Sequence, residues 1–403
     1  MSGVKNLLVV GIDVVSIANS AKEAGYKIYA ADYFGDMDLR RVCDGYVSII
    51  EQKPGKSCGR IEVEFKPEAF IEMARFFLEQ YEIDAILLSS GLDDYFDILS
   101  KLNNMVSILG NSPKIIRRVR EKLGFFEQLD RLGIQHPKTA IVKDSVEAKA
   151  VSMDIGYPVV LKPARGFGGL GSRMVRSSRE MEETFFEVSS AGEGVLIQEY
   201  IDGVHASVSF LAANGNLQVL SINEQLLGLL SVSQREAFGY CGNIVPLRLA
   251  GPIFEKCNDI AEKIALHFGL KGSNGIDLVI SKNSVPYVME VNPRFQGTLE
   301  CVEEVMRINL VESHINSCVR GSLPTIKEKA SIFSTRLILY ANKRVTAPDL
   351  TVFQEVRDVP LPETIIEKGE PLCSVITKGN SRDSSLQKAK KLAKSIYDLI
   401  RPV

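Results

Sequence analysis

The stretch Val288-Met-Glu-Val-Asn-Pro-Arg-Phe-Gln-Gly297 ends an apolar strand with a carboxylate, a carboxamide and a guanidinium in quick succession. Alternate side chains of a strand point to the same side, so Glu290 and Asn292 project from one face, about 7 Å apart. A strand that only fills a core does not normally end in this way. Two neighbouring oxygen donors on one face are typical of a site for a hard cation.

The residues before this stretch predict a third oxygen ligand. Two strand-like runs flank the polar connection Lys282-Asn-Ser284, which favours a β-hairpin. A two-residue turn there pairs Lys282 with Val285 and, counting outwards, sets Asp277 directly opposite Glu290. Opposed carboxylates destabilise a sheet unless a positive charge compensates them, and Mg²⁺ bound to a phosphate chain is a natural candidate. The alternative is an exposed hairpin with solvated acids.

A glycine-rich loop lies upstream, in Val159-Val-Leu-Lys-Pro-Ala-Arg-Gly-Phe-Gly-Gly-Leu-Gly-Ser172. Glycine lets backbone amides approach phosphate oxygens and tolerates positive φ. The loop is not a Walker A loop, because Ser172-Arg-Met-Val175 resembles a second strand rather than a helix. It does not follow the first strand of a βαβ unit, so it is not a dinucleotide fingerprint. A flap over a nucleotide explains Lys162 inside an apolar strand; a glycine-rich hairpin without ligand does not.

A polar hinge completes the pattern. The stretch from Val195 to Phe210 is apolar, then polar, then alternating. Such a connection can offer backbone donors and acceptors to an adenine ring, while a carboxylate or an imidazole reaches a ribose hydroxyl.

Glycine flap, polar hinge and paired-acid strand, in this order, resemble the nucleotide-binding core of the ATP-grasp superfamily. The likeness is greatest to its carbamoyl phosphate synthetase and biotin carboxylase branch. The resemblance implies ATP and Mg²⁺ (or Mn²⁺) as cofactors. It implies that ATP is held by Lys122, Lys162, Gly166, Gly168, Gly169, Gly171, Ser172, Gln198, Glu199, Tyr200, Ile201 and His205. The metal ligands would be Asp277, Glu290 and Asn292.

Two arginines are the catalytic candidates. On the resemblance, Arg294 would stabilise negative charge on the reacting phosphate and carboxylate. Arg235 would reach the transferring phosphate or an anionic substrate, and a surface position is the alternative for it. Arg248 is a further candidate of the same kind, and the sequence leaves the roles of Arg235 and Arg248 open.

The chemistry of the superfamily defines the expected activity. The γ phosphate of ATP is transferred to a carboxylate, and an amine attacks the acyl phosphate, giving an amide or peptide-like bond with release of ADP and phosphate. The resemblance thus implies a carbon–nitrogen ligase acting on a small carboxylate and an amine. Two alternatives stay open: a carboxylase that phosphorylates bicarbonate, and a non-catalytic ATP-binding regulatory module. The sequence contains no Gly-x-Ser-x-Gly, no His-Glu-x-x-His and no cysteine pair at metal-ligand spacing.

Composition excludes several other classes. The chain has 403 residues, 45% of them hydrophobic, and a net charge of -2, so no basic excess favours nucleic acid or a membrane surface. Its seven cysteines form no disulfide framework. No basic leader precedes an apolar core, and no run approaches the ~20 apolar residues of a membrane span, so we expect a cytoplasmic enzyme. A homodimer is usual for the resemblance, whereas the substrates and pathway are not specified.

Alternating strands and helices at the N-terminus predict an α/β protein with a parallel sheet. The expected organisation is a Rossmann-like domain at 1–112, an ATP-grasp core at 113–325 and a small α+β domain at 326–403. The loop Ser90–Asp94 is expected to contact substrate. The segment 224–243 is interpreted as too polar for a central strand, and 369–379 resembles a closing β-hairpin.

Overall fold

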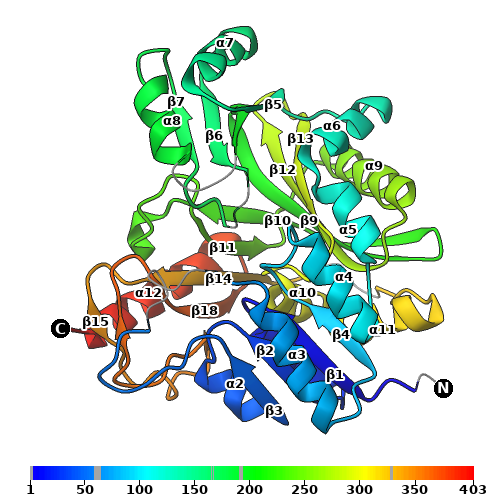
Figure 1. Cartoon of the computed structure of the whole chain (residues 1–403), viewed down its shortest axis with the longest axis vertical. Helices are drawn as coiled ribbons and strands as arrows, with labels where there is room; N and C mark the ends of the chain where they lie inside the picture. The colour runs from blue at the N-terminus through cyan, green and yellow to red at the C-terminus, as the bar shows by residue number, and fades with distance from the viewer. Residues whose placement is uncertain (1–2, 59–64, 165, 167, 190–193, 327–329) are drawn as a thin grey trace.

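A computed structural model describes residues 3–58, 65–164, 166, 168–189, 194–326 and 330–403. Arg165 and Phe167 of the predicted flap lie outside the described residues. Figure 1 labels the elements in chain order. The helices are α1 (Val15–Glu23), α2 (Met37–Val42), α3 (Ala69–Gln80), α4 (Phe96–Met105), α5 (Pro113–Arg120), α6 (Lys122–Arg131), α7 (Ser145–Ile155), α8 (Met181–Ser189), the 3-10 helix η1 (Leu230–Val232), α9 (Gly251–Phe268), α10 (Leu299–Met306), α11 (Leu310–Arg320) and α12 (Arg382–Leu399).

The strands belong to four sheets among the described residues. They are β1 (Asn6–Gly11), β2 (Lys27–Asp32), β3 (Gly45–Ser48), β4 (Ala85–Leu88), β5 (Thr139–Val142), β6 (Val159–Pro163), β7 (Arg173–Val175), β8 (Val195–Glu199), β9 (Gly203–Ala213), β10 (Asn216–Leu227), β11 (Tyr240–Val245), β12 (Gly272–Ser281), β13 (Pro286–Asn292), β14 (Phe333–Tyr340), β15 (Val345–Thr346), β16 (Val356–Arg357), β17 (Ile365–Ile366), β18 (Pro371–Gly379) and β19 (Arg401–Pro402).

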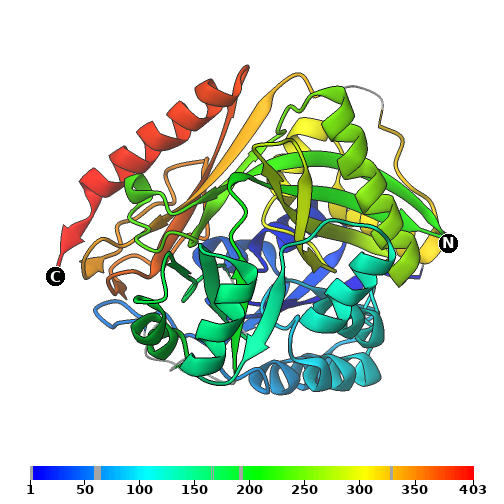
Figure 2. The same cartoon turned by 90° about the horizontal axis from the view of Figure 1, so that it is seen from above.

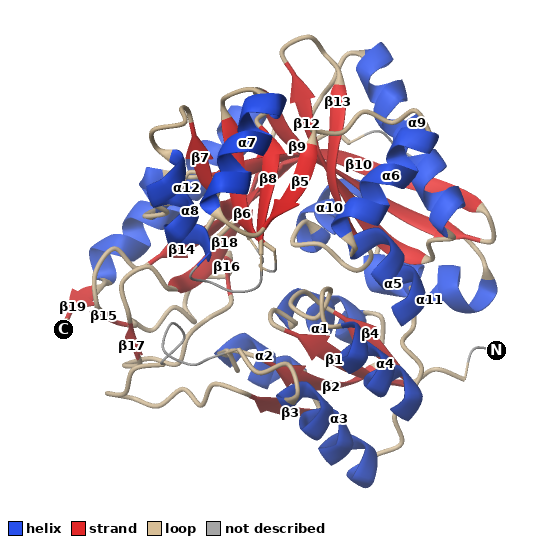
Figure 3. Ribbon diagram, turned by 45° about the horizontal axis from the view of Figure 1, so that its top comes forward, coloured by secondary structure: helices blue, strands red, loops and turns tan. Residues whose placement is uncertain are grey.

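The N-terminal region is the predicted parallel sheet, in the order β3-β2-β1-β4. Both of its faces are covered, which explains the uninterrupted apolar run of β1. Leu7 and Val9 pack in one cluster with residues of α1, α10 and α11, whereas Leu8 and Val10 pack in another with residues of α3 and α4. Figure 3 shows this sheet below the sheets that contain β8 and β12, with its strands side by side.

A second, antiparallel sheet, in the order β5-β8-β6-β7, carries the lysine and the glycine loop predicted from the sequence. Its inward-facing residues form an apolar cluster with Ala148 of α7 and with Met181 and Phe185 of α8. The two helices therefore hold one face of the sheet, and the opposite face is available to a ligand. The strand predicted at 172–175 is confirmed as β7.

The largest sheet is antiparallel and runs β13-β12-β9-β10-β11-β14-β18-β16. One face of its first strands packs against α6 and α9 in a single apolar cluster. At the other end, α12 lies along β14 and β18, as Figure 2 shows. β14 and β18 continue the sheet of the central region, so this sheet crosses the predicted domain limit at 325/326. The three domain ranges stay predictions.

Two sequence interpretations are wrong. Parts of 224–243 lie in β10 and β11, which are central strands. Their polar side chains pair within the fold: Gln225 donates to Asp277 at 2.9 Å. The segment 369–379 is not a hairpin, because its strand β18 pairs with β14 and β16 rather than with itself.

The turn between β12 and β13 also differs from the prediction. The Ser281 amide donates to the Val285 carbonyl at 2.9 Å, so the turn contains three residues, Lys282–Ser284. Ser284 has φ of 60°, the left-handed conformation that such a loop requires. The predicted pairing of Lys282 with Val285 is therefore wrong.

A β-bulge restores the predicted opposition of the acids. Leu278 pairs with Val288, but Asp277 pairs with Glu290, so Met289 is an extra residue in β13. A bulge of this kind changes the direction of the side chains that follow it. The three-residue turn and the bulge compensate each other, and the predicted opposition of Asp277 and Glu290 is confirmed.

Candidate active site

A cavity of about 670 Å³ lies where the three larger sheets meet. Most of the nucleotide and metal candidates line it, although they come from distant parts of the chain. They are Lys122, Lys162, Gly166, Gly168, Gly169, Ser172, Gln198, Glu199, Tyr200, Ile201, His205, Asp277, Glu290 and Asn292. The catalytic candidate Arg294 lines the cavity too. Gly171 and Arg235 are outside this lining set.

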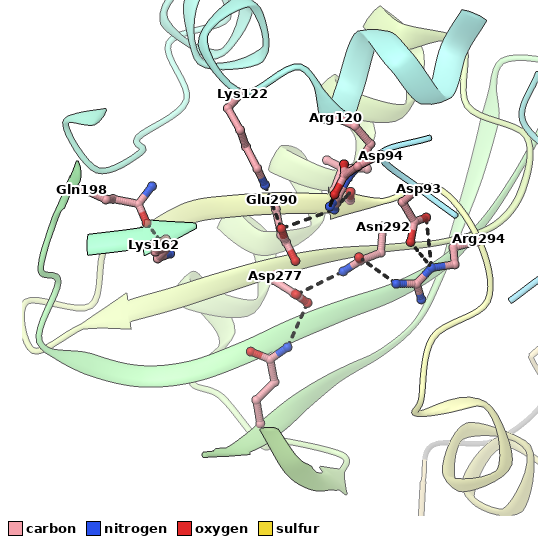
Figure 4. Close-up of polar contacts among 12 residues, drawn as sticks. Asp93, Asp94, Arg120, Lys122, Lys162, Gln198, Asp277, Glu290, Asn292 and Arg294 are labelled. Atoms are coloured by element: carbon pink, nitrogen blue, oxygen red, sulfur yellow. Dashed lines mark hydrogen bonds and ion pairs between the residues drawn. The ribbon is translucent and has the colours of Figure 1, made fainter. Parts of the chain in front are cut away.

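The paired-acid strands form one wall of the cavity (Figure 4). Asn292 Nδ2 donates to Asp277 Oδ2 at 3.0 Å, and Gln225 Nε2 donates to Asp277 Oδ1 at 2.9 Å. Burial, followed by the charge of Glu290, raises the pKa of Asp277 to about 7. A positive charge bound beside Asp277 would favour its ionised form.

Two cations contact Glu290, the opposite acid. Lys122 Nζ donates to Glu290 Oε2 at 2.9 Å, and Arg120 Nη1 contacts the same oxygen at 3.3 Å. Burial acts to raise the pKa of Glu290, but the charges of Lys122 and Arg120 outweigh burial and hold it below its ordinary range. Lys122 begins α6, as the sequence predicted. Arg120 was not predicted from the sequence as a site residue; in the structure it is 7% exposed.

Lys162 lies on β6 opposite the hinge strand β8. Its Nζ donates to Gln198 Oε1 at 2.7 Å, and Gln198 Nε2 donates to Thr139 Oγ1 at 3.0 Å. Burial, then the charge of Lys122, lowers the pKa of Lys162 to about 8. Burial, then the charge of Lys162, lowers the pKa of His205. A neighbouring anion would favour the charged form of each group.

The glycine loop approaches the start of β11. Gly169 has φ of +71°, and a Cβ there would lie 2.0 Å from the Phe238 carbonyl oxygen, so a side chain cannot be accommodated without a shift of backbone. The Tyr240 amide donates to the Gly168 carbonyl at 2.9 Å. The Gly171 amide donates to Glu236 at 2.7 Å, so a carboxylate already binds one amide of this loop.

The loop Ser90–Asp94 of the N-terminal region contacts the same site. Arg294 Nε donates to Asp93 Oδ2 at 2.9 Å (Figure 4). Arg120 makes two bonds to Asp94, of 2.8 and 2.9 Å. The loop therefore orients two arginines beside the acids.

A buried arginine of β14 forms another part of the cavity wall. Arg336 is 3% exposed, and its Nη2 donates to Asp358 at 2.7 Å and to Asp13 at 3.2 Å. The nearby acids outweigh burial and raise the pKa of Arg336 well above its ordinary value. Arg336 was not predicted from the sequence, although an arginine inside the apolar run Phe333–Tyr340 is the same kind of signal as Lys162 inside β6.

Three other polar residues lie away from the cavity. Arg235 is exposed, and its position gives no support for contact with a phosphate. Arg248 donates to the Ala330 carbonyl at 3.3 Å and lies over the Phe333 ring. His267 contacts Gln128 at 3.0 Å.

The donor set suits a hard cation coordinated together with phosphates. Two carboxylates and a carboxamide, from Asp277, Glu290 and Asn292, meet on one wall. No cluster of three or more His, Cys, Asp or Glu side chains with metal-binding potential occurs within the described ranges. A cation here would therefore need further ligands from a bound phosphate chain, which is the usual coordination of Mg²⁺.

No helix among the described residues is long and apolar enough to cross a membrane. All seven cysteines are free.

Comparison with known proteins places these elements in a family context. A family model for the ATP-grasp domain matches residues 119–298. An uncharacterised protein of Methanocaldococcus jannaschii is 27% identical over 394 residues, which cover 97% of this chain and 91% of that protein. The arginine-specific carbamoyl phosphate synthase large chain of Bacillus subtilis is 26% identical over 235 residues, covering 58% of this chain. The match spans only 22% of that large chain.

Solved structures share the fold over nearly the whole chain. The biotin carboxylase domain dimer of Hydrogenobacter thermophilus 2-oxoglutarate carboxylase, in complex with MgADP, ADP and bicarbonate, has a TM-score of 0.73 at 18% identity, with 98% of this chain and 90% of that chain covered. The L-amino acid ligase of Bacillus licheniformis has a TM-score of 0.70 at 17% identity, with 99% and 98% covered. The chain therefore contains an ATP-grasp domain, homologous to that of carbamoyl phosphate synthase large chains, within a fold shared with biotin carboxylase.

Proposed function

We propose that this protein is an ATP-dependent ligase that activates a carboxylate as an acyl phosphate and joins it to an amine. One observation carries the proposal: a single cavity joins the phosphate-binding cations and paired acids to a buried arginine outside the predicted nucleotide set. A nucleotide and a second anionic reactant can thus meet in one enclosed space.

Residues of this chain contribute to each step of the proposed reaction. Lys122 and Lys162 bind the phosphates, and the hinge Gln198–Ile201 holds the adenine. A carboxylate oxygen attacks the γ phosphorus of ATP. The bond between this phosphorus and the β–γ bridging oxygen breaks, and ADP leaves. The amine nitrogen then attacks the acyl carbon, phosphate departs with the bonding electron pair, and the amine loses a proton.

The developing negative charge is the main barrier in both steps, because oxygen atoms carry it throughout. Arg294, oriented by Asp93, is a positive group on the cavity wall that can stabilise this charge. Mg²⁺ held by Asp277, Glu290 and Asn292 would supply further charge neutralisation on the phosphates. We propose the cytoplasm as the location, since the reaction consumes ATP.

The test is release of ADP from the full chain incubated with ATP, Mg²⁺ and pairs of carboxylates and amines. The proposal predicts that release depends on both partners and that bicarbonate does not replace the carboxylate. Bicarbonate-dependent ADP release without any amine would instead support a carboxylase, in line with the biotin carboxylase likeness. ATP binding without hydrolysis in any mixture would support a non-catalytic module.

A further inference from the structure

A buried asparagine outside the cavity lining contacts the chain between Asn292 and Arg294. The linker from α4 to α5 contains Asn111, which is 2% exposed. Its Nδ2 donates to the carbonyl of Pro293 at 3.0 Å. Pro293 separates the metal candidate Asn292 from the catalytic candidate Arg294. A side chain 182 positions away in the sequence thus binds the peptide between the two candidates.

The orientation of the Asn111 side chain is fixed by its other contacts. Nδ2 also donates to Asn274 Oδ1 at 2.7 Å, and Oδ1 accepts from the Lys271 amide at 2.9 Å. Asn274, which is fully buried, donates in turn to the carbonyls of Lys271 and Gly272. Exchanging the nitrogen and the oxygen of Asn111 would set acceptor against acceptor and donor against donor. Asn111 therefore presents its donor to Pro293 in one orientation.

A second buried side chain ties the same segments together. His314 of α11 is 3% exposed, and the Ser273 amide donates to its Nδ1 at 2.8 Å. Its Nε2 therefore carries the proton and donates to the Leu109 carbonyl at 2.9 Å. The ring of His314 packs on Phe295, with centroids 4.5 Å apart. The linker, the start of β12 and the residue after Arg294 are thus joined by hydrogen bonds and packing.

The position of the Pro293 peptide decides where two side chains reach the cavity. Arg294 Nη2 donates to Asn292 Oδ1 at 3.3 Å, and Asn292 Nδ2 donates to Asp277 at 3.0 Å. Because Asn292 and Arg294 flank Pro293, a shift of this peptide would move both. A misplacement of about 1 Å in a reacting site can lower turnover by about 10².

We propose that Asn111 is a positioning residue for the phosphoryl transfer. Its bond to the Pro293 carbonyl sets where Asn292 meets the metal and where Arg294 meets the reacting phosphate. The proposal rests on the proposed function, because it names a residue that holds the site of that reaction in shape. Asn111 itself contacts neither ATP nor metal in this assignment.

The test compares Asn111→Ala with Asn103→Ala as the matched control. Asn103 Oδ1 accepts from the Ile108 amide at 3.0 Å, so each variant removes an asparagine that binds to or within the same linker. Of these two asparagines, Asn111 is the one that contacts Pro293. Calorimetric titration of ATP in EDTA and at increasing Mg²⁺, together with ADP release from the full chain, supplies the measurements.

Asn111→Ala should keep the wild-type affinity for ATP in EDTA, because Lys162 and the hinge lie on another sheet. The Mg²⁺ concentration that gives half of the gain in ATP affinity should rise at least about tenfold, as expected when a residue that orients a metal ligand is removed. At saturating Mg²⁺, kcat should fall at least about tenfold while KM for ATP stays near its wild-type value. Asn103→Ala should match the wild type in all of these measurements.

A wild-type response to Mg²⁺ in Asn111→Ala overturns the inference. An equal loss in Asn103→Ala, or a parallel loss of ATP affinity in EDTA, overturns it too, because either result would show only a general loss of stability. Should Asn111→Ala fold poorly, Asn111→Asp replaces it. That variant keeps the acceptor for the Lys271 amide but sets an oxygen against the Pro293 carbonyl, and the same outcomes decide.

Failure of this inference can be separated from failure of the proposed function. If the wild type binds ATP with Mg²⁺ but releases no ADP with any pair of substrates, the ligase reaction falls, and the Mg²⁺ response of ATP binding still decides the role of Asn111. If ADP release in the wild type requires both substrates but Asn111→Ala behaves like the wild type, the ligase stands and the role of Asn111 falls. If the wild type does not bind ATP, both fall.

Discussion

Replacing Glu290 with Gln tests whether the paired acids form a metal site or only neutralise neighbouring cations. In the structure, Glu290 is 2.9 Å from Lys122 and 3.3 Å from Arg120. The substitution keeps the size of the side chain and removes one charge. If Glu290 is only a counter-ion, the substitution should raise ATP affinity with or without Mg²⁺. If Glu290 is a metal ligand, the substitution should raise ATP affinity only when Mg²⁺ is absent.

The magnitude follows from the geometry. Coulomb's law with an effective dielectric constant of about 20 gives roughly 6 kcal/mol between unit charges 2.9 Å apart. The side chains of Glu290 and Lys122 are 33% and 22% exposed, so solvent screening reduces the net effect to about 1–2 kcal/mol. Without metal, Lys122 and Arg120 become available to phosphate, and Glu290→Gln should bind ATP roughly tenfold more tightly than wild type.

With Mg²⁺ the order reverses. Glu290→Gln should lose the gain in ATP affinity that Mg²⁺ gives the wild type, and turnover should fall by about 10² or more. Calorimetric titration of ATP in EDTA and in Mg²⁺, together with ADP release, measures both effects. Glu304→Gln is the matched control, since Glu304 is 43% exposed and its partner is Lys378 on the surface. Wild-type turnover and an unchanged response to Mg²⁺ in Glu290→Gln would refute the metal assignment.

Three further outcomes are expected. Gly169→Ala should weaken ATP binding by about tenfold, because at φ of +71° its Cβ would lie 2.0 Å from the Phe238 carbonyl oxygen. Gly166→Ala is the control, since a Cβ there meets nothing within 4 Å, and its calorimetric ATP affinity should stay near normal. Equal losses of ATP affinity in the two variants would contradict the flap geometry. Since the pKa of Lys162 is lowered to about 8, ATP affinity measured without metal should fall as pH rises through 8. In Lys162→Met, calorimetric titrations over the same pH range should show no such fall, and a fall that persists would show that another group is responsible. Burial raises the pKa of Glu303 from its ordinary value of 4.5 to about 7. The stability that its neutral form contributes is therefore fully present below pH 4.5 and is lost as pH rises through 7. In denaturant unfolding, Glu303→Gln should be more stable than wild type by roughly 3 kcal/mol at pH 8 and equally stable at pH 4, and parallel pH curves for the two proteins would show that Glu303 is not the group responsible.

The parts of the site that follow local pattern could be predicted from the sequence. The lysine inside an apolar strand, the glycine loop and the alternating acids of β13 are all visible within short windows, because each depends on strand periodicity or on glycine. The cavity brings Lys162, Asp277 and Glu290 together as those windows suggested.

Contacts between distant segments could not be predicted in the same way. Asp93 and Arg294 are separated by 201 residues, and nothing in either segment indicates the other. Arg336 carried a local signal, but its partners Asp13 and Asp358 come from opposite ends of the chain. The polar segment 224–243 was misinterpreted because strands that line a cavity can satisfy polar side chains across the sheet, as Gln225 does with Asp277.

In the hairpin that opposes the acids, the conformation of the turn and the conformation of the strand are coupled. A turn of two residues without a bulge and a turn of three residues with Met289 as a bulge give the same opposition of Asp277 and Glu290. If β12 and β13 paired past Leu278 and Val288 without the bulge, Met289 would lie opposite Asp277, and Glu290 would lie opposite Ile276, a fully buried core residue. Loss of the bulge would therefore keep the two acids opposed only if the turn also changed to the two residues Asn283 and Ser284, so turn and bulge must change together.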